Sequence, residues 1–141
     1  MTKLPQILVS IRPKWADLIL TGEKTLEYRR NMSLKALLLA RRMWIYASKP
    51  VGKVIGCASI RIWEGTCVFD MQGNNGCLSR AEYDGYFKGA ERHYGIVIKD
   101  FAALARPILL AEIGIAHAPQ SWMYMPESAL EMIGETIGGC K

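Results

Sequence analysis

A group of charged side chains at positions 24–30 is the densest set of residues in the sequence that could do chemistry. Lys24, Glu27, Arg29 and Arg30 follow a turn that contains Gly22. In an extended segment, Glu27 and Arg29 project from the same side. A carboxylate between two cations stays ionised and holds both in place, so that they can be presented to a phosphate. The alternative is a solvated strand edge with surface ion pairs of little energetic value.

A second polar cluster lies where a predicted strand meets a predicted helix. It contains Ser10, Arg12, Lys14 and Trp15. The first backbone N–H groups of a helix and the positive end of its dipole favour a bound anion. We expect Trp15 to belong to the core rather than to serve as a stacking platform for a base.

Two further segments combine polar and aromatic groups. Tyr46, Ser48, Lys49 and Lys53 surround a predicted strand end and turn, where an aromatic ring can stack a base while an ammonium group reaches the backbone. In residues 119–124, Gln and Ser can read base edges, and Trp or Tyr can stack. The alternatives are a surface lysine turn and a segment that closes a barrel around a buried Trp122.

The charge of the 141-residue chain is unevenly distributed. Its net charge is +5, but residues 1–60 carry 11 basic and 3 acidic side chains, whereas residues 61–141 carry 7 and 10. A basic first half predicts attraction to an anion, with nucleic acid as the leading candidate. Exposed aromatic residues such as Trp63, Trp122 and Tyr124 leave open a third interpretation, a protein–protein adaptor.

Several classes of protein are not expected. No apolar run is long enough to span a bilayer, and Arg12 and Lys14 interrupt the early apolar stretch, so we predict a cytoplasmic protein without a secretory signal. Neither a metal site nor a cofactor is expected: there are two histidines, and the four cysteines form no C-x-x-C pair. Free, mostly buried thiols are the expected state of these cysteines, including the evenly spaced Cys57, Cys67 and Cys77.

The elements that must position these residues follow from hydrophobic periodicity, glycines and prolines. Pro13 suits the first turn of a helix that Gly22 ends, and Ser79 with Glu82 forms a capping box before a helix whose buried face is Tyr83, Tyr86 and Phe87. We predict strands at 6–11, 25–29, 43–47, 54–63, 94–99 and 108–115, and helices at 13–21, 33–42, from Ser79 onward and at 126–133.

These elements do not alternate as strand and helix, so a doubly wound sheet is disfavoured. We predict a single α+β domain over residues 1–141, with a core at about 5–125 and a helix and tail at 126–141. Its architecture is expected to be a small mixed β-barrel of five to six strands, with two to three short helices at the rim.

The segment from Ile7 to Arg30 resembles the opening of the ASCH domain, a PUA-like family. The likeness rests on a strand ending Ser-Ile-Arg-Pro, a short helix, and Gly22-x-Lys24-Thr25-x-Glu27-x-Arg29. Shorter matches follow at residues 45–50, 54–56 and 119–122. The resemblance implies a β-barrel related to the RNA-binding PUA domain, with a ligand cleft over the barrel mouth. Lys24, Glu27 and Arg29 match the polar cleft motif of the family.

The resemblance also implies partners and roles. It indicates that single-stranded RNA or a modified nucleotide binds in a basic cleft lined by Arg12, Lys24, Glu27, Arg29, Tyr46, Ser48, Lys53 and Ser121. The main hypothesis is therefore an RNA- or nucleotide-binding module.

The alternative hypothesis is an enzyme in which Lys24 and Glu27 are catalytic. Some small family members resemble amidohydrolases that act on N4-acetylcytidine through Lys, Thr and Glu. Lys24 matches that lysine, Glu27 occupies the Thr position, and Glu64 is a candidate for the Glu. Others have been proposed as metal-independent ribonucleases, for which Glu27 or a lysine would be the base and Arg29 or Lys53 the electrophile.

Overall fold

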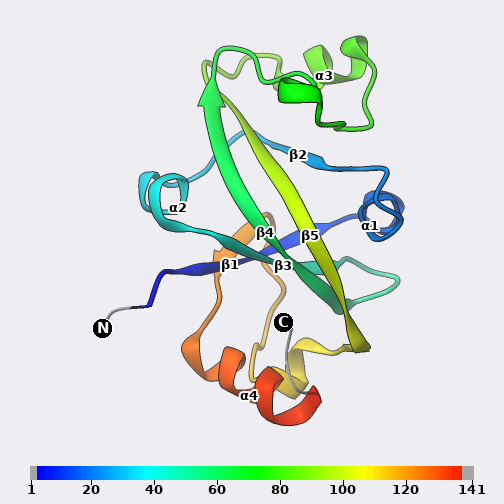
Figure 1. Ribbon diagram of the computed structural model, residues 1–141, viewed down its shortest axis with the longest axis vertical. Coiled ribbons are helices and arrows are strands. Elements are labelled where there is room, and N and C mark those ends of the chain that lie inside the picture. Colours follow the sequence, from blue (N-terminus) through cyan, green and yellow to red (C-terminus); the bar gives the residue numbers. More distant parts are fainter. Residues whose placement is uncertain (1–2, 138–141) are drawn as a thin grey trace.

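One curled, six-stranded sheet forms the framework of the computed structural model, which describes residues 3–137 (Figure 1). The strand order is β2-β5-β4-β3-β1-β6. Strands β1 and β3 are parallel, and the other neighbours are antiparallel. The strands are β1 (Gln6–Ile11), β2 (Leu26–Arg29), β3 (Arg42–Ala47), β4 (Lys53–Gly65), β5 (His93–Ile108) and β6 (Trp122–Tyr124).

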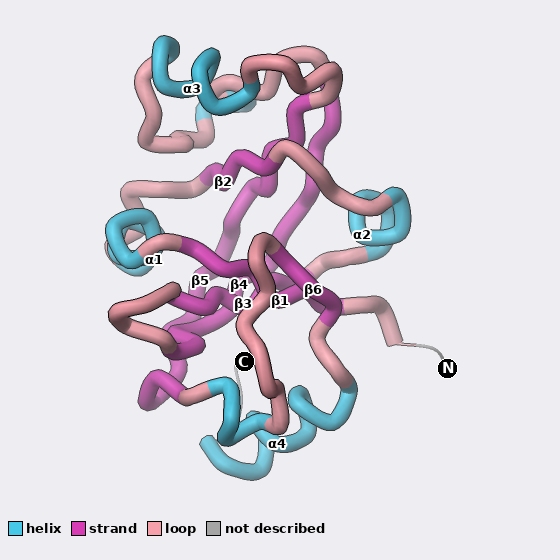
Figure 2. Tube along the Cα trace, turned by 180° about the vertical axis from the view of Figure 1, so that it is seen from behind, coloured by secondary structure: helices cyan, strands magenta, loops and turns pink. Residues whose placement is uncertain are grey.

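Four α-helices surround this sheet in the described residues. They are α1 (Pro13–Leu20), α2 (Leu34–Leu39), α3 (Arg80–Phe87) and α4 (Glu127–Ile137), and two short 3₁₀ helices, η1 (Met71–Gly73) and η2 (Leu110–Ile113), accompany them. In Figure 1, α3 lies at the top and α4 at the bottom, with α1 and α2 on opposite sides of the strands between them. Figure 2 shows the same arrangement from behind, with β1 and β6 crossing the middle of the molecule. The predicted α+β architecture of five to six strands is confirmed, with four helices instead of two or three.

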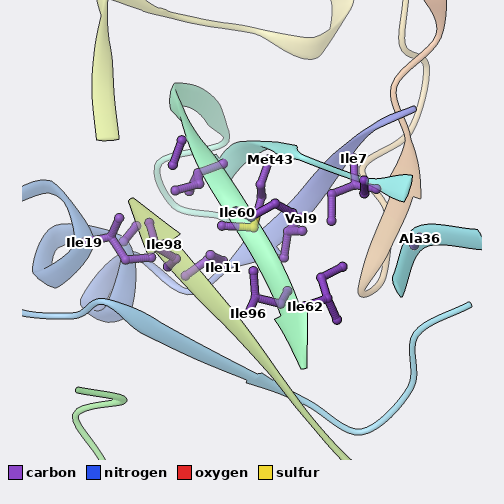
Figure 3. Packing of buried hydrophobic residues seen from close by; sticks show 14 of the residues in the cluster. Ile7, Val9, Ile11, Ile19, Ala36, Met43, Ile60, Ile62, Ile96 and Ile98 are labelled. Carbon is purple, nitrogen blue, oxygen red and sulfur yellow. The ribbon is translucent and has the colours of Figure 1, made fainter. Parts of the chain in front are cut away.

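Strand β1 is buried on both faces and lies at the centre of the packing. Ile7, Val9 and Ile11 point into the main core cluster, and Leu8 points into a second cluster beneath η2 and α4. Alternate residues of β3 and β4 divide between the same two clusters, because successive side chains of a strand face opposite ways. Figure 3 shows the main cluster, which contains Ile7, Val9 and Ile11 together with Ile60 and Ile96.

The two helix boundaries near the charged clusters follow local rules. Pro13 occupies the first turn of α1, and Gly22 adopts the left-handed conformation (φ +85°) just after the helix ends. Ser79 and Glu82 form the predicted capping box at the start of α3. Tyr83 and Phe87 of α3 are buried as predicted. The third aromatic residue, Tyr86, was expected on the buried face but is 39% exposed.

The predicted strand at 108–115 is wrong. Ile108 ends β5, which is a single long strand that includes the predicted segment 94–99, and residues 110–113 form η2. Glu112 accepts a hydrogen bond from the Leu109 N–H at 2.8 Å, and Gly114 has a φ of +74°. These features produce one tight turn, which buries Leu110 and Ile113 on the same side. The run of apolar residues at 108–115 is typical of a buried strand and of a buried turn alike, so the sequence pattern did not distinguish them.

Three other predictions are refined by the structure. The helix expected at 126–133 begins at Glu127 and continues to Ile137. Cys57 is buried as expected, but it is disulfide-bonded and not the free thiol that was predicted. Cys67 and Cys77 are free thiols, of which Cys67 is exposed and Cys77 is partly buried. No helix in the described part of the chain is long and apolar enough to cross a membrane.

Candidate functional site

A cavity of about 740 Å³ opens beside edge strand β2. Its wall comes from five regions that are distant in sequence: the β1–α1 junction, β2, the end of β3, the start of α3 and the segment 118–120. Ligand pockets commonly measure about 300–1,000 Å³, so the cavity has the size of a small-molecule or nucleotide site. Its lining includes four basic side chains, from Arg12, Lys24, Arg29 and Lys49, and two acidic ones, from Glu27 and Glu82.

Glu27 is the carboxylate at the centre of this lining. Its Oε2 lies 2.6 Å from Nη2 of Arg29, and its Oε1 lies 3.3 Å from Nζ of Lys24. The side chain is 11% exposed and faces the cavity, as the predicted alternation of β2 requires. A carboxylate has about four acceptor positions, so two ion pairs leave acceptor capacity for a ligand hydroxyl.

Lys24 is buried, and its ammonium group has three polar contacts. Its Nζ donates to the carbonyl oxygens of Leu26 and Gly76, each at 2.8 Å, in addition to its ion pair with Glu27. Two of the three N–H donors of the ammonium group are therefore bound to carbonyl oxygens, and the ion pair with Glu27 is its third polar contact. The side chain is 3% exposed and lies beneath the rings of Trp15 and Tyr28, at 5.3 and 5.7 Å from their centres. Lys24 therefore joins the 74–78 loop to β2 and fixes Glu27.

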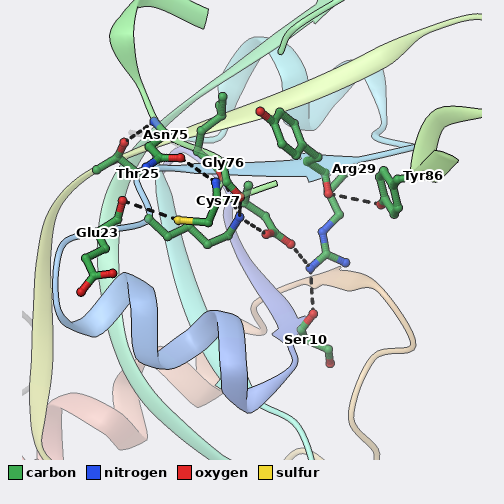
Figure 4. A network of polar contacts seen from close by, with 12 residues as sticks. Ser10, Glu23, Thr25, Arg29, Asn75, Gly76, Cys77 and Tyr86 are labelled. Atoms are coloured by element: carbon green, nitrogen blue, oxygen red, sulfur yellow. Dashed lines mark hydrogen bonds and ion pairs between the residues drawn. The ribbon is translucent and has the colours of Figure 1, made fainter. Parts of the chain in front are cut away.

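Arg29 joins the two ends of the curled sheet. Nη2 donates to the carbonyl oxygen of Ser10 at 2.8 Å (Figure 4). Nη1 donates to Oγ of Ser121 at 3.1 Å. Strand β2 lies at one edge of the sheet, and Ser121 precedes β6, which lies at the other. Ser10 also binds the 119–121 segment, through Oγ to the Pro119 carbonyl at 2.6 Å. Side-chain bonds therefore connect edges that no backbone ladder joins.

The remaining nitrogen of Arg29 is chemically notable. Nε is buried and has no hydrogen-bond partner, and it is the sole such side-chain nitrogen or oxygen within residues 3–137. An unpaired buried donor costs free energy, and such groups are frequent at functional sites.

Aromatic side chains complete the lining. Trp15 packs against the core but also borders the cavity, so the core assignment made from sequence is only part of its role. Tyr86 of α3 also borders the cavity and donates from its hydroxyl to the Tyr28 carbonyl at 3.2 Å. Its partial burial raises the pKa of the Tyr86 phenol. The cavity thus combines cations with ring surfaces, which is the combination that binds single-stranded nucleic acids.

The structure brings most of the predicted site residues together. Arg12, Lys24, Glu27, Arg29, Tyr46 and Ser48 line the cavity. Ser121 reaches the site through its bond to Arg29. Lys53 does not line the cavity: it is exposed at the start of β4, and Lys49, four residues earlier in the turn, occupies the cavity wall instead. Glu64, on the distal end of β4, does not line it either; it pairs with Arg92 at 3.3 Å.

In the structure, Arg30 lies outside the charged cluster to which it was assigned from the sequence. It donates to the carbonyl oxygens of Tyr86 and Lys88, at 2.6 and 3.0 Å, where α3 ends. Arg30 follows the last residue of β2 and points away from Arg29, so that it binds the carbonyl end of α3 instead of the cavity.

Two cavity residues were assigned other roles from sequence. Tyr86 was placed in the core, although its partial burial agrees equally well with a cavity wall. Glu82 was treated as a helix cap, and it lines the cavity while keeping that role. The hydrogen bond from the Ser79 N–H lowers the pKa of Glu82. Only knowledge of how α3 packs beside β2 could have placed these residues at the site.

Two other kinds of site, a protein–protein surface and a metal site, can be compared with this geometry. Of the aromatic residues considered for a protein–protein surface, Trp63 is 38% exposed, whereas Trp122 and Tyr124 are partly buried and pack against the core. In the described part of the chain, no three His, Cys, Asp or Glu side chains gather closely enough to hold a metal ion.

These observations define the structural class of the protein: a curled mixed sheet with a basic cavity where the two edges of the sheet meet. Residues 9–105 match the model of the ASCH domain. The chain therefore belongs to the ASCH domain family, as the resemblance indicated.

Relatives of known sequence and structure support this assignment. The chain is 34% identical over 140 residues to an ASCH domain-containing ribonuclease from Zymomonas mobilis, covering 91% of this chain and 93% of that protein. The crystal structure of ASCH from Zymomonas mobilis is similar, with a TM-score of 0.80 and 31% identity over 96% of this chain and 98% of that one. A mutant of the Zymomonas mobilis protein gives a TM-score of 0.81 at 28% identity, over 97% and 99% of the two chains.

Proposed function

We propose that this protein binds single-stranded RNA in the cavity beside β2 and cleaves it as a metal-independent ribonuclease. The observation that carries the proposal is Glu27, a cavity-facing carboxylate fixed by two cations, with further cations at the cavity wall. The 34% identity to a protein named as a ribonuclease supports the same reaction class.

The cations of the cavity wall divide into two groups with different tasks. Lys24 and Arg29 are nearly buried, and apart from the unpartnered Nε of Arg29 their nitrogens contact protein acceptors. Arg12 and Lys49 are exposed, and neither side chain forms a hydrogen bond or ion pair with a described residue. We assign phosphate binding to Arg12 and Lys49, since their donors are available, and positioning of the site to Lys24 and Arg29.

The aromatic lining supplies the second part of RNA recognition. Trp15 of α1 and Tyr86 of α3 both line the cavity, and a base stacked on either ring gains about 1–3 kcal/mol. A cavity of this volume admits an unpaired base but not the stacked bases of a duplex, since duplex bases are held within their own helix. The proposed substrate is therefore single-stranded.

Cleavage requires a base, an acid and charge stabilisation. In the proposed reaction, Glu27 accepts the proton of a ribose 2′-OH, whose oxygen attacks the adjacent phosphorus. The P–O5′ bond breaks, the leaving oxygen receives the Tyr46 hydroxyl proton, and a 2′,3′-cyclic phosphate forms. Arg12 and Lys49 stabilise the negative charge on the pentacoordinate phosphorus.

The amidohydrolase alternative requires Lys24 to act directly on the substrate. A lysine that acts on an acyl group must present a free donor or lone pair, whereas Lys24 donates two hydrogen bonds to carbonyl oxygens and is paired with Glu27. Glu27 stands where the amidohydrolase motif has a threonine. These two observations favour the ribonuclease over the deacylase.

The test compares RNA cleavage by the wild type and by Glu27→Gln. A short unstructured RNA labelled at its 5′ end, and DNA of the same sequence, would be incubated with each protein in EDTA. We expect RNA products ending in a 2′,3′-cyclic phosphate, intact DNA, and a rate about 10²–10⁴ times lower for Glu27→Gln, because general-base catalysis is lost.

Controls separate the remaining outcomes. Lys99→Ala, which removes an exposed cation outside the cavity, should cleave like the wild type. Equal cleavage by the wild type and a folded Glu27→Gln protein would identify a contaminating nuclease and overturn the proposal. Acetate release from N4-acetylcytidine without RNA cleavage would establish the amidohydrolase instead. Tight, salt-dependent binding without any turnover would establish a binding module.

A further inference from the structure

A second cavity adjoins the proposed RNA site. Its volume is about 510 Å³, and it lies between the β3–β4 turn and the segment that follows η2. Tyr46, Lys49 and Ala118 line both cavities, so the two hollows share a border formed by these side chains. A polymer that occupies the first cavity can therefore continue across this border into the second.

The lining of the second cavity differs from that of the first. Leu110, Ala111, Ile115 and Ala116 provide an apolar wall, and His117 is a polar group at its rim. Among the described residues that line it there is no carboxylate, and Lys49 at the border is the one formally charged side chain. An apolar hollow with an adjacent cation and an imidazole suits the face of a nucleobase joined to a phosphate, because the base is largely apolar and the phosphate is anionic.

We propose that this second cavity holds the nucleoside next to the one in the first cavity, with the connecting phosphate at the Tyr46–Lys49 border. The inference rests on the proposed function and extends it. The protein then recognises a strand of at least two nucleosides, and the phosphate at the border is the one cleaved. A free mononucleotide fills only one of the two hollows.

Tyr46 has a position that agrees with this placement. A Cβ built on Gly52 would lie 3.7 Å from the Tyr46 hydroxyl oxygen and 3.9 Å from Cγ of Lys49. The phenol and the lysine stem thus meet at the same glycine of the β3–β4 turn. Both side chains are near the phosphate that joins the two hollows, as the proposed acid and the proposed cation must be.

A bulky residue in the second cavity tests the inference. Ala116 is exposed, lines the second cavity and does not line the first, so Ala116→Trp fills the hollow without disturbing the core. Ala105→Trp is the matched control, because Ala105 is an exposed strand residue that lines neither cavity. The probes are a mixed-sequence tetranucleotide with 2′-deoxyriboses, which resists cleavage, and a mixture of 3′-mononucleotides, with dissociation constants measured by calorimetry.

We expect the wild type and Ala105→Trp to bind the tetranucleotide at least tenfold more tightly than the mononucleotides. Ala116→Trp should lose most of this difference while its mononucleotide affinity stays within about twofold. His117→Ala should weaken the tetranucleotide alone, by a few-fold. Unchanged tetranucleotide affinity in Ala116→Trp, or equal affinities for both probes in the wild type, would overturn this inference and leave the first site intact. Absence of binding to either probe would overturn the proposed function as well.

Discussion

The guanidinium of Arg29 and the main-chain carbonyl of Ser10 meet at 2.8 Å, and this bond joins edge strand β2 to β1 across the gap in the curled sheet. The same guanidinium pairs with Glu27 and binds Ser121. One side chain therefore closes the molecule and orients the proposed base. Catalytic geometry and stability are coupled through this residue.

Arg29→Ala should lower the free energy of unfolding by about 3–5 kcal/mol, because it leaves the buried Glu27 carboxylate without its shorter ion pair. Arg61→Ala, which removes an exposed arginine from the surface of β4, should change stability by less than about 0.5 kcal/mol. Urea unfolding monitored by tryptophan fluorescence measures both. If Arg29→Ala unfolds at the wild-type urea concentration, the bridge does not hold the sheet edges together.

Gly76 is required by the close contact of its loop with Tyr28. A Cβ at this position would overlap the Tyr28 ring, and the Gly76 carbonyl accepts a hydrogen bond from Lys24. Gly76→Ala should therefore destabilise the protein by about 1–3 kcal/mol, as overpacking does. It should also slow RNA cleavage, because the loop that holds Lys24 must move.

A second glycine provides the control for this substitution. Gly85 lies within α3, and a Cβ there would meet no atom within 4 Å. Gly85→Ala should raise stability by about 0.5–1 kcal/mol, since alanine favours the helix over glycine. Thermal melting of the two variants should therefore move in opposite directions. A Gly76→Ala protein as stable as the wild type would contradict the described contact.

The local parts of this fold and site were predictable from sequence, because neighbouring residues determine them. Alternation along β2 placed Glu27 and Arg29 on one face, and the capping box located the start of α3. The partner of Lys24 was not predictable, since Gly76 is 52 residues away. Whether Lys49 or Lys53 lines the cavity depends on the conformation of the β3–β4 turn, which cannot be predicted from charge and spacing.

Arg12 should contribute to RNA affinity without contributing to stability. Its side chain is exposed at the cavity wall and has no ion pair among the described residues. Arg12→Ala should weaken binding of unrelated single-stranded sequences to a similar extent and reduce the slope of log Kd against log salt by about 0.7. Fluorescence anisotropy between low and moderate salt measures this slope. An unchanged slope would mean that Arg12 does not contact a phosphate.

Tyr83 should make the protein sensitive to alkaline pH. Burial is the main cause that raises the pKa of Tyr83 to about 12, compared with about 10 for an exposed phenol. The unfolded chain then loses this proton at a lower pH than the folded protein, so stability is retained below pH 10 and falls between about pH 10 and 12.

The variant Tyr83→Phe isolates this effect. At pH 7 it should be less stable by about 1–3 kcal/mol, because the Val68 N–H loses the acceptor that lies 2.8 Å away. Above pH 10 the difference from the wild type should become smaller, since the variant has no phenol to titrate at this position. Urea midpoints measured at intervals from pH 7 to 12 provide the comparison. A difference that stays constant with pH would contradict the assignment.

Cys67 should be more reactive than Cys77. Cys67 is exposed, and a hydrogen bond from the Phe69 backbone N–H is the main cause that lowers the pKa of its thiol, with a smaller contribution from Arg80. Burial raises the pKa of Cys77. Since the thiolate is the nucleophile, iodoacetamide at neutral pH should modify Cys67 first.

Peptide mass spectrometry after timed alkylation measures the two rates separately. Arg80→Ala should shift the pH dependence of Cys67 alkylation to higher pH, because the nearby positive charge is lost. Arg92→Ala, which removes an exposed arginine from the ion pair with Glu64, should leave that dependence unchanged. Faster modification of Cys77 at every pH would show that access, rather than stabilisation of the thiolate, determines reactivity in this loop.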